Sequence, residues 1–182
     1  MIRLFTALDL PEAVRDRLAM LQSGVPGARW IRPENLHVTL RFIGEVDEHV
    51  AEDLDASLAR AAAPGFDLRL SGVGHFGTER KPTTLWVGVE RSDALQFLHD
   101  KVDRALVAAG LTPDDRKFKP HVTLARLRSH ARVERVGRWL EANALFQAGP
   151  IRIDGFVLYR SHLGSEGSVY EPLVEYPLKE AA

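Results

Sequence analysis

Two short segments of this sequence carry the same pair of reactive side chains. Residues 37–40 and 121–124 both read His-Val-Thr-Leu, so a threonine hydroxyl follows each histidine by two positions. A histidine with an ordinary pKa of about 6.5 can accept or donate a proton near neutrality. Two such imidazoles at one phosphodiester would act as base and acid, while the hydroxyls donate hydrogen bonds to phosphate oxygens.

Strand alternation predicts which neighbours share a face with the first histidine. His37, Thr39 and Arg41 occupy alternate positions, so they would line a polar face, while Val38 and the other apolar residues up to Phe42 would face the core.

The second segment gives the same pattern. Lys119, His121 and Thr123 would line the polar face, and strict alternation points Arg126 away from His121 unless a β-bulge intervenes. Two such strands placed side by side would bring both histidines to one cleft.

The spacing along the chain indicates a duplicated plan. His37 and His121 lie 84 positions apart, and the predicted helix and strand after each keep about the same offset. The predicted strands are 3–10, the His37 segment, 66–73, 84–90, the His121 segment, 151–159 and 169–178. The predicted helices begin at Pro11, run over 47–63, run from a cap at Ser92 to about residue 110, and run over 133–145.

These elements predict an α+β fold. Because long helical crossovers often join parallel strands, each half would contain a mixed sheet. We therefore expect residues 1–182 to form a single bilobal domain, with two mixed or antiparallel sheets facing a central cleft and helices packed outside.

Composition narrows the chemistry. Among 182 residues, 24 Lys and Arg balance 25 Asp and Glu, so the chain as a whole has no strong attraction to nucleic acids or membranes. The absence of cysteine excludes disulfides, thiolate catalysis and cysteine-ligated zinc. No apolar run approaches about 20 residues, so we expect a cytoplasmic protein without a membrane span. The His-x-Thr spacing supplies no second zinc ligand, so we expect neither metal nor cofactor.

Other histidines and aromatic residues are weaker candidates. His75 and His162 lie at predicted strand ends near the cleft, whereas simple exposure on helices would explain His49, His99 and His130. Four aromatic residues could stack on a nucleobase, although core packing would also explain the first two: Trp30, Phe42, Phe118 and Tyr170.

Taken with their flanks, the two segments resemble the two-histidine phosphoesterase superfamily, and within it the RNA 2′,3′-cyclic phosphodiesterases, also called 2′-5′ RNA ligases. The matching stretches are Arg3-Leu4-Phe5, residues 30–36, 41–45 and 119–126. The resemblance implies a bilobal fold with a central cleft. It also implies opening of a 2′,3′-cyclic phosphate at an RNA end to leave a 2′-phosphate, and reversible 2′-5′ joining of tRNA halves.

The resemblance also implies residue roles. His37 and His121 would be the catalytic pair. We assign His37 as the general acid, or proton donor, and His121 as the general base, or proton acceptor; the likeness of the two segments leaves the opposite order open, and the roles exchange when the reaction reverses. Thr39 and Thr123 would hold the phosphate, and Arg126 matches an arginine that the family has in or near its site. Alternation adds Arg41 and Lys119 as further substrate-binding candidates, and Tyr170 joins them as a residue that could stack on a base.

The expected partner is RNA with a 2′,3′-cyclic phosphate end, such as tRNA halves, oligonucleotides or nucleotides, bound by a monomer without a membrane or metal. Two alternatives remain open. The substrate could be a cyclic phosphate of ADP-ribose or a 2′-5′ oligoadenylate, or the protein could be a module that binds RNA-end phosphates without turnover.

Overall fold

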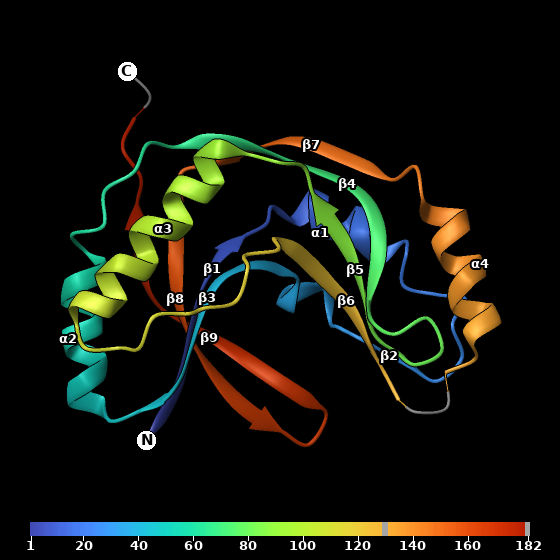
Figure 1. Ribbon diagram of the computed structural model, residues 1–182, viewed down its shortest axis with the longest axis horizontal. Helices are drawn as coiled ribbons and strands as arrows, with labels where there is room; N and C mark the ends of the chain where they lie inside the picture. The colour runs from blue at the N-terminus through green and yellow to red at the C-terminus, as the bar shows by residue number, and fades with distance from the viewer. Residues whose placement is uncertain (129–130, 181–182) are drawn as a thin grey trace.

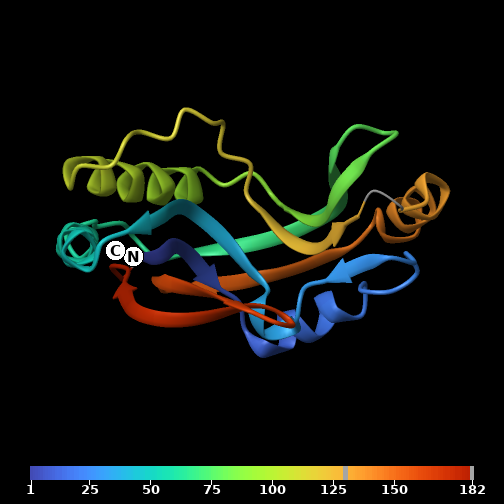
Figure 2. The same cartoon turned by 90° about the horizontal axis from the view of Figure 1, so that it is seen from below.

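The protein is built on a curved sheet with helices around it. The computed structural model describes residues 1–128 and 131–180, so His130 lies outside the described residues. Figure 1 shows the strands crossing the middle of the molecule, with α2 and α3 beyond one end and α4 beyond the other, and Figure 2 shows the curvature of the sheet. The expected α+β class is confirmed.

The strands of the described residues form one nine-stranded sheet, in the order β7-β4-β5-β6-β3-β1-β8-β9, with β2 paired to β6. Their bounds are β1 Ile2–Asp9, β2 Ala28–Trp30, β3 His37–Val46, β4 Phe66–Gly77, β5 Pro82–Val89, β6 His121–Leu127, β7 Gln147–Ile153, β8 Gly155–Gly164 and β9 Gly167–Pro177.

The prediction of two sheets is wrong, and of the two predicted kinds, mixed or antiparallel, the antiparallel one is confirmed. The strands belong to one sheet, and every pairing between named strands of the described residues is antiparallel. The path between β5 and β6 shows why a helical crossover need not give parallel strands. After the helix α3 (Asp93–Ala108), a segment without regular structure brings the chain back before β6 begins, so β6 runs antiparallel to β5.

The remaining helices cover the sheet and its ends. They are α1 Glu12–Ala19, α2 Glu48–Leu58 and α4 Val133–Asn143, and a 3-10 turn spans Pro33–Asn35. Ser57 of α2 donates a hydrogen bond of 2.6 Å to the Ala105 carbonyl of α3, and Trp139 of α4 donates one of 2.8 Å to the Leu21 carbonyl. None of the helices in the described ranges has both the length and the apolar character of a membrane span.

Element boundaries differ from the sequence prediction in a few places. The helix predicted over 47–63 ends at Leu58, and the strand predicted over 151–159 is two strands that meet at Asp154. The Ser92 cap is confirmed, because its hydroxyl accepts a hydrogen bond of 3.1 Å from the Leu95 backbone amide. The short strand β2 was not predicted, because three residues are too few to show alternation.

Candidate functional site

The strands β3 and β6 lie beside each other in the sheet, and their contact brings the two histidines together. Val38 pairs with Val122 in antiparallel register. By the geometry of such a pair, His37 falls opposite Thr123, and Thr39 falls opposite His121. The two histidines are therefore diagonal neighbours on one face, at a spacing typically of about 7–8 Å.

Both strands contain the same irregularity just after the threonine. Next to β3, the strand β1 pairs Thr6 with Arg41 and Ala7 with Thr39, so Leu40 has no partner of its own. Next to β6, the strand β5 pairs Leu85 with Ala125 and Trp86 with Thr123, so Leu124 is likewise passed over. A bulge of this kind shifts the alternation by one residue.

The two bulges decide which arginine faces the histidines. Beyond them, Arg41 and Ala125 turn into the protein and are buried, whereas Phe42 and Arg126 return to the histidine face. Phe42 is 54% exposed. The prediction that Phe42 faces the core is therefore wrong, and so is the prediction that Arg41 shares the polar face of His37. Arg126 lies on the histidine face, where strict alternation without a bulge would not place it.

Arg41 instead ties together the segment that leads to β6. Its guanidinium donates 2.8 Å to Asp103 on α3 and also donates to the Thr112 carbonyl, and Asp114 lies 3.9 Å away. The side chain of Arg41 is only 7% exposed. The segment that it holds carries Arg116, which lines the histidine cavity.

This buried network gives a stability prediction. We expect Arg41→Met to lower the free energy of unfolding by about 3 kcal/mol, because it leaves Asp103 in a half-buried position without its cation. Denaturant unfolding followed by circular dichroism measures the change. Arg126→Met is the matched control, since Arg126 is exposed and pairs with no carboxylate of the described residues, so its loss should change stability by less than about 0.5 kcal/mol. Equal stability of the two variants would contradict the structural role of Arg41.

Backbone carbonyls fix the orientation of both imidazoles. Nδ1 of His37 lies 2.7 Å from the Asn35 oxygen, and Nδ1 of His121 lies 2.6 Å from the Lys119 oxygen. A carbonyl only accepts, so each Nδ1 must carry a proton, and in the neutral rings Nε2 is then the atom that can accept one. Nε2 of His37 is 2.9 Å from the Thr39 hydroxyl. The contribution of Lys119 is thus its carbonyl, and its side chain does not line the cavity.

Aromatic rings surround each imidazole. The Phe5 and Tyr170 rings lie 5.1 and 5.3 Å from that of His37, and the Phe76 and Trp86 rings lie 4.8 and 6.3 Å from that of His121.

These rings, with the rest of the site, shield both imidazoles in part from water. Burial lowers the pKa of His37 below its ordinary value, although the hydrogen bond to Asn35 partly offsets this, and the charge of His121 lowers it further. Burial also lowers the pKa of His121, with the positive charge of Arg126 adding to the effect and the Lys119 carbonyl opposing it. Both imidazoles are therefore held toward their neutral forms.

A cavity of about 310 Å³ collects these side chains. It is lined by Ile31, Asn35, His37, Thr39, Phe42, Phe76, Thr84, Arg116, His121, Thr123, Arg126 and Tyr170. Six of the eight residues proposed from the sequence line it, and Arg41 and Lys119 do not. Sequence reasoning missed Phe76, Thr84 and Arg116, since their place depends on which strands and segments are neighbours. In the described part of the chain, no three or more His, Asp or Glu side chains gather where they could hold a metal ion.

Among the weaker candidates, Phe42 and Tyr170 line this cavity, whereas the other histidines of the described residues do not. His162 forms an ion pair of 2.7 Å with Glu171, and His75 contacts the Phe76 carbonyl at 3.2 Å. His99 stacks on Phe118 with ring centroids 4.0 Å apart and is 14% exposed, so the prediction of a solvated position is wrong for it.

The sequence is similar to a known protein family and to its curated members. The 2′-5′ RNA ligase superfamily matches the sequence over residues 10–165. A curated relative from Thermus thermophilus, named RNA 2′,3′-cyclic phosphodiesterase, is 37% identical over 190 residues, covering 98% of this chain and 91% of its own.

Solved structures agree with this assignment. The structure of TT0787 of Thermus thermophilus superposes with a TM-score of 0.80 at 30% identity and full coverage of both chains. The structure of E. coli LigT complexed with 3′-AMP gives a TM-score of 0.78 at 28% identity, covering 97% of this chain and 98% of LigT. The family resemblance drawn from the paired His-x-Thr segments is thus confirmed, and the chain belongs to the 2′-5′ RNA ligase superfamily, a group of two-histidine phosphoesterases.

Proposed function

We propose that the protein is an RNA 2′,3′-cyclic phosphodiesterase that opens a terminal cyclic phosphate to leave a 2′-phosphate, without a metal ion. The observation that carries the proposal is the cavity itself. It presents Nε2 of His37, Nε2 of His121, two threonine hydroxyls and the Arg126 guanidinium on one face of adjacent strands. Curated relatives that match most of the chain are named for this activity.

The reaction needs one proton removed and one supplied. His121 takes a proton from water as the water oxygen bonds to phosphorus, and the bond from phosphorus to the ribose 3′ oxygen breaks. His37, protonated at Nε2, gives its proton to that oxygen. Thr39, Thr123 and Arg126 donate hydrogen bonds to the non-bridging oxygens, where negative charge builds in the transition state.

Two features favour this assignment of acid and base. The positive charge of Arg126 helps to keep His121 neutral, which suits a base, and His121 is the more exposed of the two imidazoles. His37 is the more enclosed imidazole, so its protonated form is a strong acid for the departing oxygen. Joining two RNA ends by a 2′-5′ bond would use the same site, with a 5′ hydroxyl in place of water. Because one chain supplies both histidines, a monomer would suffice.

The test is end-group analysis of an RNA oligonucleotide that carries a 2′,3′-cyclic phosphate. We expect complete conversion to the 2′-phosphate, identified by digestion to nucleotides and chromatography against authentic 2′- and 3′-phosphate standards. The rate should be the same with and without EDTA, because the proposed chemistry uses only side chains.

Other outcomes would replace this proposal. Stoichiometric binding without product over a long incubation would identify a module that binds RNA-end phosphates. A higher kcat/KM for a cyclic phosphate of ADP-ribose, or for a 2′-5′ oligoadenylate, would move the substrate away from RNA ends. A 3′-phosphate product would mean that the 2′ oxygen departs, and loss of activity in EDTA would refute the metal-free chemistry.

A further inference from the structure

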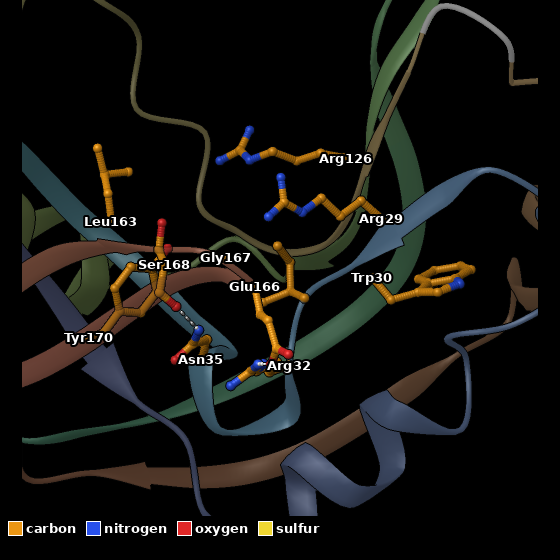
Figure 3. A pocket seen from close by; sticks show the side chains of 12 residues that line it. Arg29, Trp30, Arg32, Asn35, Arg126, Leu163, Glu166, Gly167, Ser168 and Tyr170 are labelled. Carbon is orange, nitrogen blue, oxygen red and sulfur yellow. Dashed lines mark hydrogen bonds and ion pairs between the residues drawn. The ribbon is translucent and has the colours of Figure 1, made fainter.

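A second cavity of about 280 Å³ opens beside the first (Figure 3). The two cavities share four lining residues, Ile31, Asn35, Arg126 and Tyr170, so they form neighbouring parts of one depression. We call the second cavity, which Arg29, Arg32, Arg126, Glu166 and Ser168 help to line, the arginine groove. It lies between β2, the 3-10 turn and the hairpin of β8 and β9.

Two arginines of the groove are direct neighbours across a strand pair. Arg29 of β2 pairs with Arg126 of β6. Figure 3 shows the two side chains extended side by side with their guanidinium groups toward the same side of the groove. Like charges directly opposite each other destabilise a sheet. No carboxylate in the described residues forms an ion pair with either one, so the pair is suited to an anion.

A third cation is held across the groove. Arg32 forms an ion pair of 2.8 Å with Glu166, and their side chains are 47% and 83% exposed. Such an exposed pair is weak and exchanges readily with a competing anion. Nδ2 of Asn35 donates 2.8 Å to the Ser168 carbonyl, which keeps the hairpin at the groove while the Arg32 pair opens.

We propose that the arginine groove binds the phosphate on the 5′ side of the terminal nucleotide, so that Arg29 and Arg32 select RNA ends over cyclic nucleosides. This rests on the proposed function, because it assumes that the cyclic phosphate occupies the histidine cavity. Arg126 lines both cavities, which places successive phosphates of one strand on either side of it. Glu166 competes with the RNA for Arg32 and so limits the affinity.

The experiment compares kcat/KM for three substrates that end in the same 2′,3′-cyclic phosphate. The first is a nucleoside without a 5′ phosphate, the second carries a 5′-monophosphate, and the third is a dinucleotide. We expect the second and third to exceed the first by about tenfold or more, because a charged hydrogen bond in the groove is strong. An advantage of the dinucleotide alone would show that the diester, and not a free phosphate, is the ligand.

Single substitutions assign that selectivity. Arg29→Gln and Arg32→Gln should each lower the ratio of dinucleotide to nucleoside kcat/KM by about tenfold, and each should flatten the logarithmic salt dependence of dinucleotide binding by about one unit. Glu166→Gln frees Arg32, so it should raise the ratio about threefold. Arg60→Gln is the matched control, since Arg60 is an exposed arginine after α2 that lines neither cavity and should leave the ratio unchanged.

A ratio near one in the wild type, or equal loss on all substrates in Arg29→Gln, would overturn this inference and leave the proposed function standing. If no substrate turns over, the proposed function fails instead. The groove is then judged by fluorescence anisotropy with a labelled dinucleotide ending in a 2′-phosphate. Unchanged affinity in Arg29→Gln and Arg32→Gln would overturn the inference in that case too.

Discussion

His37→Ala and His121→Ala should each lower kcat for a 2′,3′-cyclic phosphate by about a thousandfold, because each removes one of the two proton transfers. Nδ1 of each imidazole contacts a backbone carbonyl, at 2.7 Å for His37 and 2.6 Å for His121. Neither substitution therefore leaves another side chain without its partner at this atom, and we expect both variants to fold. The measurement is kcat on a dinucleotide that ends in a 2′,3′-cyclic phosphate, with circular dichroism to verify folding. His49→Ala, at an exposed position on α2, is the control and should retain full activity.

The pH dependence of kcat/KM provides a second test of the roles of His37 and His121. Because the pKa values of both histidines are lowered, the state with one protonated and one neutral imidazole is most populated below about pH 6.5. We therefore expect a bell-shaped profile of kcat/KM with its maximum on the acidic side of about 6.5. A bound phosphate anion favours the imidazolium, so the profile of kcat should lie at higher pH. Full activity in either alanine variant, or a kcat/KM maximum above about pH 7, would contradict the acid-base pair.

The residues of the cavity could be predicted from the sequence up to the two bulges. Alternation correctly places Thr39 with His37 and Thr123 with His121, because strand geometry is regular over those three positions. It fails at Arg41 and Ala125, two residues after each threonine, because the neighbouring strands pass over Leu40 and Leu124. A bulge depends on the register of the partner strand, and a single strand's sequence does not reveal it.

The topology of the sheet was harder to predict from the sequence than the positions of the helices. Helix positions followed from apolar spacing, and the Ser92 cap from its own chemistry. The direction of β6 relative to β5 depends on the path between α3 and β6, where Arg41 anchors the Thr112 carbonyl. An arginine on one strand and an acceptor about 70 positions later form no local pattern, so crossover length alone favoured the wrong, parallel arrangement.

Arg126→Met should lower kcat/KM by about a hundredfold, the second large effect that we expect. The guanidinium lines the cavity beside both imidazoles, and donors that stabilise charge developing on phosphate oxygens typically contribute a factor of about 10²–10³. Arg126→Lys should recover only part of this, because an ammonium group keeps the charge but loses the two-pronged geometry that matches phosphate. The measurements are kcat/KM and competitive inhibition by inorganic phosphate, which should weaken in parallel.

The control for this prediction is Arg60→Met, at an exposed position that lines neither cavity, and its kcat/KM should stay within about twofold of the wild type. A kcat/KM within about threefold of the wild type for Arg126→Met would show that the bulge of β6 brings an arginine to the cavity without using it. The strand β3 carries a different residue at the equivalent position. At the equivalent place after its own bulge, β3 presents Phe42, so the two halves of the site offer the phosphate one cation and one apolar ring. Of these two equivalent positions, the one on the side of His121 therefore supplies the cation that stabilises negative charge building on the phosphate oxygens as water attacks.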